Sequence, residues 1–271
     1  GLIAGFTAAA SIGLVLGFYF IGAFLIGTAL PAWWLAYMAL LARPVGSNGA
    51  MTLEWYPIGR LVLWATFIGT AAVVVSFMLN FGTDKETFQA GLRNYATELV
   101  RILESRDPTA AARLDIKDLV EALTTIAPRG AAMLATLLNV FNLWLAGRIV
   151  RVSGRLQRPW PDLSTLSLPD LTPAFLAVAV AGTFLPDIAG IFAGVVTAGL
   201  LMAYAILGLA VLHSITRHNN GRIVILTATY TAIVMSAGFA LLAAAMLGVA
   251  DTTFNIRGRF TSKRGPPSLS T

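Results

Sequence analysis

The sequence predicts an all-α membrane protein, a polytopic helix bundle with about seven apolar helical segments and two amphipathic helices outside the bilayer or at its surface. Three observations lead to this class. Of the 271 residues, 57% are hydrophobic and 12% are charged, whereas typical soluble domains have about 25% charged residues. Residues 1–42 carry no charge at all. Further apolar runs, several of them long enough to cross a membrane, recur along the rest of the chain.

The uncharged first tract is too long for a single crossing. A helix of this length would measure about 63 Å, twice the thickness of the hydrocarbon layer. We therefore expect two helices, near residues 2–18 and 22–42, with a break between Gly17 and Gly22. Pro31 would lie inside the second helix as a kink, which membrane helices tolerate.

Five further apolar runs complete the seven segments. They lie near residues 61–80, 131–147, 172–185, 188–212 and 223–250. The run at 172–185 is short, so it either crosses or re-enters from the same side. The run at 223–250 is long, so it is either one crossing or a hairpin broken around residues 236–238. Each half of such a hairpin would reach only about 21 Å, too short to cross alone.

A charged insert at residues 82–129 separates the first membrane segments from the later ones, and it holds 15 of the 32 charges. Thr83 and Glu86 form a capping-box start for one helix, and Asp107-Pro108 ends it. A second helix follows and stops before Pro128. Apolar residues recur on one face of each helix: Phe88, Leu92, Tyr95, Leu99 and Ile102 in the first, and Ile116, Leu119, Val120, Leu123 and Ile126 in the second. We expect the pair to lie against the membrane or to cap the bundle, with a lid or partner-docking element as the alternative.

The chain thus divides into membrane helices at 1–81, the insert at 82–129, membrane helices at 130–256 and a basic tail at 257–271 that we expect to be disordered. It begins with Gly1 and has no signal-peptide pattern, so we expect a processed or truncated start. The basic residues of the loops favour a topology in which the charged insert lies outside the cell. The side of the tail stays open, because its four basic residues contradict this topology if all seven segments cross.

Four stretches of sequence resemble a known family. They are PAWWLAYMALLARP at 31–44, NLWLAGRIVRVSGRLQRPWPDL at 142–163, LGLAVLHSITR at 207–217 and LGVADTTFNIRGRF at 247–260. They are similar to the YybS-like family of bacterial membrane proteins, a domain of unknown function, over essentially the whole chain. The N-terminal half more distantly resembles the S-components of energy-coupling-factor transporters, which bind small molecules. The resemblance implies a multi-pass protein of the bacterial cytoplasmic (inner) membrane, and it supplies no site residues.

The sequence holds no recognisable catalytic constellation. It contains no cysteine and two histidines, and it lacks the common motifs for zinc hydrolysis, nucleophilic serine, phosphate loops and calcium loops. We therefore expect no enzymatic activity, no cofactor and no metal. The basic residues come without aromatic platforms or a nucleic-acid-binding motif, so nucleic acid is not an expected partner.

Two groups of polar residues near the 131–147 helix are candidates for a site. Thr136, Asn139 and Asn142 share one side of that helix, and they either bond neighbouring helices or line a polar cavity. Four arginines follow at helical spacing: Arg148, Arg151, Arg155 and Arg158. On an extension of the helix they would share one face and contact anionic lipid headgroups. A phosphorylated ligand or an acidic partner is the alternative.

Two acidic residues flank later apolar runs. Asp187 can cap the 188–212 helix, while Asp251 comes at the end of a helix, where the macrodipole disfavours an acid. We therefore expect Asp251 to reach an arginine, such as Arg257, or a backbone donor.

Two functions are compatible with these features. The first is binding or transport of a small solute near Asn139 and Asn142. The second is an accessory subunit that docks a larger complex through residues 83–126 or through faces of small residues. These small residues are Gly1, Gly5, Ala9, Gly13 and Gly17 in the first helix, and Gly190, Gly194 and Ala198 in a later one.

Overall fold

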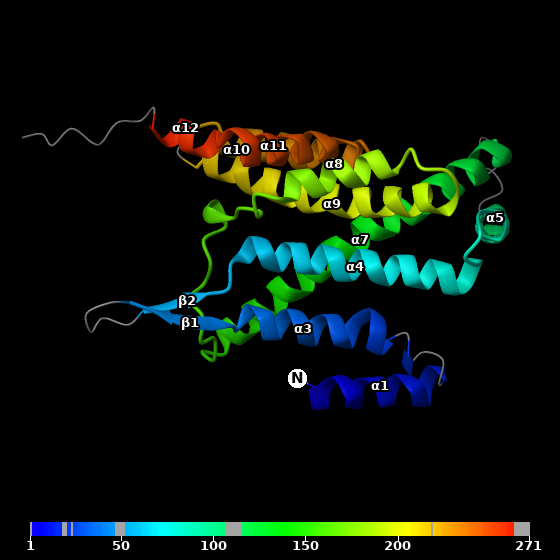
Figure 1. The fold of residues 1–271 in the computed structure, drawn as a ribbon, viewed down its shortest axis with the longest axis horizontal. Helices are drawn as coiled ribbons and strands as arrows, with labels where there is room; N and C mark the ends of the chain where they lie inside the picture. Colours follow the sequence, from blue (N-terminus) through cyan, green and yellow to red (C-terminus); the bar gives the residue numbers. More distant parts are fainter. Residues whose placement is uncertain are drawn as a thin grey trace, which may run out of the picture. The chain divides into compact units, whose positions relative to one another are not determined.

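The computed structural model describes residues 2–17, 21–22, 24–46, 52–106, 115–217 and 219–262. These form helices and one small β-hairpin (Figure 1), so the all-α prediction is confirmed. The elements are α1 (Leu2–Leu16), η1 (Leu25–Ala29), α3 (Leu30–Ala39), β1 (Ala42–Val45), β2 (Thr52–Trp55), α4 (Ile58–Phe81), α5 (Lys85–Arg106), α7 (Ile116–Val152), η2 (Leu163–Thr165), α8 (Thr172–Gly182), α9 (Asp187–Ile215), α10 (Arg222–Met235), α11 (Ala240–Phe254) and α12 (Ile256–Ser262).

Three helices of the described residues are long and apolar enough to cross a membrane, judged by length and composition. They are α4, α7 and α9, with 24, 37 and 29 residues. At 1.5 Å per residue even α4 measures about 36 Å, which exceeds the hydrocarbon thickness. The apolar helices α8, α10 and α11 are shorter. The described residues therefore give three clear candidate spans and a set of shorter apolar helices, and the predicted count of about seven apolar segments is not confirmed.

The chain forms two compact units, and the long helices contribute to both. The first unit comprises residues 1–33, 65–140 and 177–199, and the second comprises 34–64, 141–176 and 200–271. Ala65, Ala132 and Thr136 are completely buried in the first unit, and Tyr204 and Val211 in the second.

The helix before the hairpin accommodates Pro31 through a π-helical turn. Leu30 N–H donates to the carbonyl of Leu25, five residues back, within η1. Such a turn absorbs the misfit that proline creates, because its ring clashes with the preceding turn of a regular α-helix. Upstream, α1 ends at Leu16 and Gly17 has φ +104°. Residues 18–20, where the break was predicted, lie outside the described residues.

A β-hairpin follows α3, between the first two apolar helices that the sequence predicted and the run near residues 61–80. Its strands β1 and β2 are antiparallel, with Ala42 opposite Trp55 and Val45 opposite Thr52. The Arg43 Nε and Glu54 Oε2 atoms form an exposed ion pair at 2.7 Å. The four-residue strands are too short for their alternating pattern to stand out from a loop in sequence.

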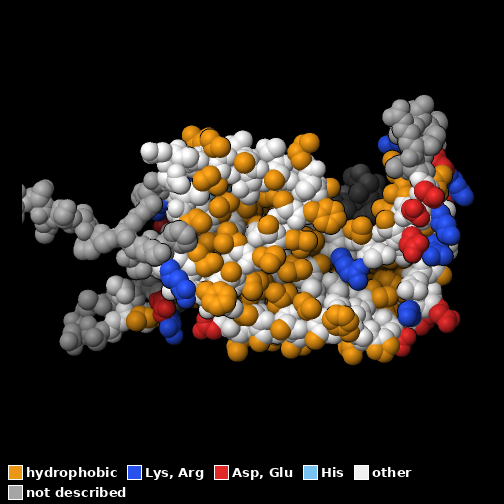
Figure 2. Space-filling view, turned by 90° about the horizontal axis from the view of Figure 1, so that it is seen from above, with side chains coloured by type: hydrophobic (Ala, Val, Ile, Leu, Met, Phe, Trp, Pro, Cys, Tyr) orange, Lys and Arg blue, Asp and Glu red, His pale blue; other side chains and the backbone are white. Residues whose placement is uncertain are grey.

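The charged insert begins with a different cap from the predicted one. Asp84, not Thr83, caps α5, because the Asp84 Oδ1 accepts a hydrogen bond from Thr87 N–H at 2.8 Å. This hydrogen bond lowers the pKa of Asp84. Helix α5 ends at Arg106, and Asp107 and Pro108, which were predicted to end it, lie outside the described residues. Figure 2 shows the acidic and basic side chains of this region gathered at the right of the molecule, while apolar side chains cover much of the visible face.

The predicted apolar face of α5 is only partly buried. The buried residues follow one line at four-residue spacing: Phe88, Leu92, Ala96 and Val100. Tyr95, Leu99 and Ile102 were predicted on the same face but are exposed. The buried line packs on the start of α7, where Val120 joins a cluster with Ala96 and Val100.

The predicted stop before Pro128 is wrong, because α7 runs without interruption through this residue. Proline removes one hydrogen bond and strains the preceding turn. Both flanks of Pro128 are held in place by packing, since Val120 is buried before it and Ala132 after it. Tertiary packing therefore outweighs the local preference of proline.

The long run at 223–250 is broken, as one of the two alternatives predicted. Helix α10 ends at Met235 and α11 begins at Ala240, and the turn between them includes Ala237 at φ +49° and Gly238 at φ +92°. The two helices contact each other (Figure 1). The tail prediction is wrong in part, since α12 forms residues 256–262. Residues 263–271 lie outside the described residues.

Candidate functional site

Thr136 and Asn139 face α4 within the first unit. Asn139 Nδ2 donates a hydrogen bond to the Ala65 carbonyl at 3.2 Å. Gly69 permits the close approach, because a Cβ at this position would lie 3.0 Å from the Asn139 amide nitrogen and 3.2 Å from the Thr136 backbone nitrogen. Asn142 is exposed. The structure therefore joins Thr136 and Asn139 to α4, but it does not bring Asn142 into the same surroundings.

The Thr136 hydroxyl is a buried polar group that has no hydrogen-bond partner among the described residues. The side chain is completely buried. An unsatisfied hydroxyl costs about 1–3 kcal/mol, and valine has nearly the same shape. We expect Thr136→Val to raise the free energy of unfolding in detergent by about 1 kcal/mol. A decrease would show that the hydroxyl has a polar partner, as the cavity interpretation requires.

The four arginines do not share one helix face, so this prediction is wrong. Helix α7 ends at Val152, and Gly154 follows with φ +67°. Glycine adopts this left-handed conformation without steric cost and commonly ends helices. Only Arg148 and Arg151 lie on α7, and Arg155 and Arg158 belong to the segment after it.

The arginines contact different partners in the second unit. The guanidinium carbons of Arg148 and Arg151 lie 5.7 and 4.9 Å from the centre of the Trp160 ring. Arg158 Nη1 donates to the Ala39 carbonyl at 3.0 Å, and burial lowers the pKa of Arg158. Arg155 is exposed. The four residues therefore lie in different surroundings, and Arg148 and Arg151 are the two that share one aromatic ring.

Asp251 and Arg257 form a buried ion pair in the second unit. The Asp251 carboxylate accepts hydrogen bonds from Arg257 Nε at 2.9 Å and from Arg257 N–H at 3.0 Å. A third contact joins Arg257 Nη2 to Asp251 Oδ2 at 2.7 Å. The two side chains are 4% and 16% exposed. Asn255, at φ +48°, turns the chain between α11 and α12 so that Arg257 returns to the acid.

Arg257 also binds a distant loop. Its Nη1 donates to the Ser164 carbonyl at 2.6 Å, and its Nη2 donates to the Leu166 carbonyl at 2.7 Å. Asp162 caps η2 in this loop by accepting from Ser164 N–H, which lowers the pKa of Asp162. The arrangement satisfies the charges locally and joins the chain end to residues 162–166. We interpret it as a structural contact, because the Asp251 carboxylate and the Arg257 guanidinium bind each other and backbone groups.

Asp187 occupies the first turn of α9, where a negative charge suits the macrodipole. It is exposed, and its backbone has φ +61°. No hydrogen bond from a backbone N–H to this carboxylate is found among the described residues, so its expected capping role is not supported by geometry. Asp187 belongs to the first unit, whereas Asp251 and Arg257 belong to the second.

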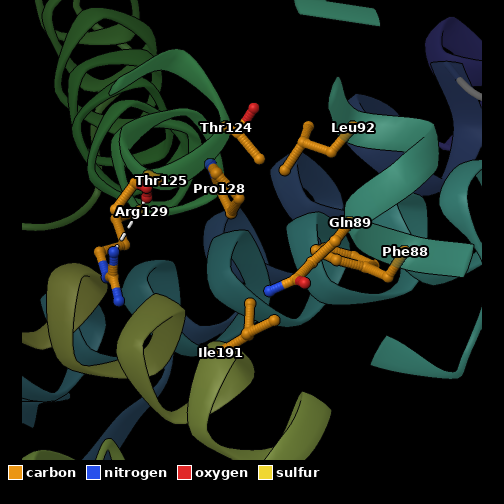
Figure 3. A pocket seen from close by; sticks show the side chains of 8 residues that line it. All are labelled: Phe88, Gln89, Leu92, Thr124, Thr125, Pro128, Arg129 and Ile191. Atoms are coloured by element: carbon orange, nitrogen blue, oxygen red, sulfur yellow. Dashed lines mark hydrogen bonds between the residues drawn. The ribbon is translucent and has the colours of Figure 1, made fainter. Parts of the chain in front are cut away.

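A pocket in the first unit combines an apolar wall with a positive charge, and the sequence analysis missed it. It has a volume of about 180 Å³. Its wall comes from α5, α7 and α9 (Figure 3). The lining residues are Phe88, Gln89, Leu92, Thr124, Thr125, Pro128, Arg129 and Ile191. Three of these belong to α5, so the charged insert forms part of the pocket wall.

Arg129 is the charged group of this pocket. Its Nη1 donates to the Thr125 carbonyl at 2.9 Å, and a Cβ at Gly194 would lie 2.9 Å from its Nε. The absence of a side chain at Gly194 therefore lets the guanidinium lie against α9. Among the described residues no acidic side chain forms an ion pair with Arg129. Thr124 and Thr125 donate their hydroxyls to carbonyls of their own helix, so the side-chain donors left in the pocket for an anionic ligand are those of Arg129 and Gln89.

The span-capable helices and the exposed apolar side chains are those of a helical membrane protein. The model of one family, described as "Predicted membrane protein (DUF2232)", matches residues 2–252. The chain belongs to this family, whose function is unknown. No curated protein and no solved structure matches the chain.

Proposed function

We propose that this protein binds a small solute without chemical conversion, as a binding or transport protein of the bacterial cytoplasmic membrane that crosses it several times. The observation that carries the proposal is the pocket around Arg129. Ligand sites typically combine apolar walls with a few convergent polar groups.

The chemistry of the pocket favours a small solute with a carboxylate and an apolar body. The guanidinium of Arg129 offers a planar set of donors that matches a carboxylate in a bidentate way. Phe88, Leu92 and Ile191 supply the apolar wall. The volume of about 180 Å³ is below the range of about 300–1,000 Å³ that suits drug-sized ligands. The solute should therefore be small.

We expect Arg129→Gln to weaken binding of a matching carboxylate by about tenfold or more, because a hydrogen bond to a charged group contributes about 1.5–3 kcal/mol. The measurement is the rise in melting temperature of the detergent-solubilised full chain with a panel of short aliphatic and aromatic carboxylates. Arg93→Gln is the matched control, since Arg93 is an exposed arginine of α5 that does not line the pocket.

The proposal fails if no carboxylate of the panel stabilises the wild-type protein, or if Arg129→Gln and Arg93→Gln respond alike. Purification of a stable complex in mild detergent would favour the accessory-subunit alternative instead, provided that the partner covers the exposed Tyr95, Leu99 and Ile102 of α5.

A further inference from the structure

The end of α7 carries two arginines beside one aromatic ring. Trp160 Cζ3 would lie 3.5 Å from a Cβ at Gly147, so the ring rests on the helix at this glycine. Arg148 and Arg151 lie next to the same ring, at 5.7 and 4.9 Å from its centre. One turn of helix separates the two arginines, and both therefore project from the same side of α7.

The local sequence brings the ring back to the helix. Gly154 ends α7 and turns the chain, and Arg155 N–H donates to the Val150 carbonyl at 3.1 Å in this turn. Pro159 and Pro161 flank Trp160 and restrict the backbone on both sides of it. These backbone constraints restrict the position of the Trp160 ring. Arg148 and Arg151 lie beside this ring.

The pair has positive charge that no acid neutralises. Within the described part of the chain, neither Arg148 nor Arg151 forms an ion pair, and the nearby Asp162 lies 3.8 Å from Arg217. A contact with the ring face attracts a guanidinium but leaves its N–H groups without acceptors. Two forked donor groups side by side suit the oxygens of a phosphate.

The pair is surrounded by the kinds of side chain that are typical of a membrane interface. The apolar side chains of Trp144, Ile149 and Val152 are 45%, 59% and 80% exposed at this end of the span-capable α7. Exposed apolar residues of a membrane helix face lipid, and tryptophan and arginine mark the level of the headgroups. A phosphate at this level belongs to a lipid.

We propose that Arg148, Arg151 and Trp160 form a binding site for the phosphate of an anionic phospholipid headgroup. The arginines bind the phosphate oxygens, and the Trp160 ring holds both guanidinium groups in place. This site lies in the second unit and the Arg129 pocket in the first, so either proposal can fail without the other.

The test is native mass spectrometry of the full chain released from vesicles of phosphatidylglycerol and phosphatidylcholine. Each basic residue near an anionic lipid surface contributes about fivefold to lipid affinity. The double variant Arg148→Gln with Arg151→Gln should therefore lower the retained ratio of anionic to zwitterionic lipid about twenty-five-fold. Replacing both by lysine keeps the charge but loses the forked donors, so it should restore only part of this ratio. Arg155→Gln is the matched control, because this exposed arginine belongs to the same segment and has no described side-chain contact with Trp160.

An unchanged ratio in the double glutamine variant overturns the proposal. If Arg155→Gln lowers this lipid ratio as much as the double variant does, the proposal is also overturned. Anionic lipid would then be attracted by the overall positive charge of this segment and not by a specific site. Inorganic phosphate supplies the last comparison. If it displaces phosphatidylglycerol from the wild type but has no effect on the double variant, the ligand is a free phosphate and the assignment to lipid is wrong.

Discussion

Asp251→Ala is expected to lower the free energy of unfolding by about 3–5 kcal/mol, because it breaks a buried ion pair by removing the carboxylate that the Arg257 guanidinium contacts. The Asp251 side chain is 4% exposed and accepts two hydrogen bonds from Arg257. The two carbonyls that Arg257 also binds, at Ser164 and Leu166, cannot neutralise its charge. Chemical denaturation of the detergent-solubilised protein, followed by circular dichroism, measures the change.

The exposed pair of Arg43 and Glu54 is the matched control. Its side chains are 77% and 53% exposed, so Glu54→Ala should change the free energy of unfolding by less than about 1 kcal/mol. Combining Asp251→Ala with Arg257→Met removes both charges, and it should be less destabilising than Asp251→Ala alone. Equal effects of Asp251→Ala and Glu54→Ala would contradict this account of the ion pair.

Gly208→Ala is expected to lower the free energy of unfolding by about 1–3 kcal/mol through overpacking. A Cβ at Gly208 would collide with the Ala244 carbonyl, and one at Gly248 would collide with the Tyr204 carbonyl. The backbones of α9 and α11 therefore touch at these two glycines, as is common in membrane helix pairs. The melting temperature in detergent measures the loss.

Gly130→Ala serves as the control for this substitution. Gly130 lies inside α7, and apart from its chain neighbours and the nearby backbone of α7, no described atom lies within 4 Å of a Cβ built there. Alanine has the higher helix propensity, so this change should stabilise the protein by about 0.5–1 kcal/mol. If both variants melt at the same temperature as the wild type, close packing of α9 on α11 is not important for stability.

Sequence reasoning located the long apolar helices because their hydropathy is a local property. The predicted run at 188–212 corresponds to α9 at 187–215, and 61–80 corresponds to α4 at 58–81. It failed at Pro128 because packing of α7 on both flanks overrides a local rule. It also failed at Arg155 and Arg158, because one left-handed glycine ends the helix before them.

In the candidate sites too, contacts between residues close in sequence could be predicted, whereas contacts between distant residues could not. Asp251 and Arg257 are six residues apart, so a partner for Asp251 could be expected from sequence. The carbonyls that Arg257 binds lie 93 and 91 residues away. The Arg129 pocket needs three helices to meet, and no local pattern predicts which residues of α5 and α9 face each other.

Electron cryomicroscopy of the purified full chain with a saturating carboxylate from the panel tests the proposed function most directly. Non-protein density is expected in the pocket, in contact with the Arg129 guanidinium and enclosed by Phe88 and Ile191. The same density should be absent from Arg129→Gln. An empty pocket at saturating ligand, or a neighbouring protein chain seated over α5, would contradict it.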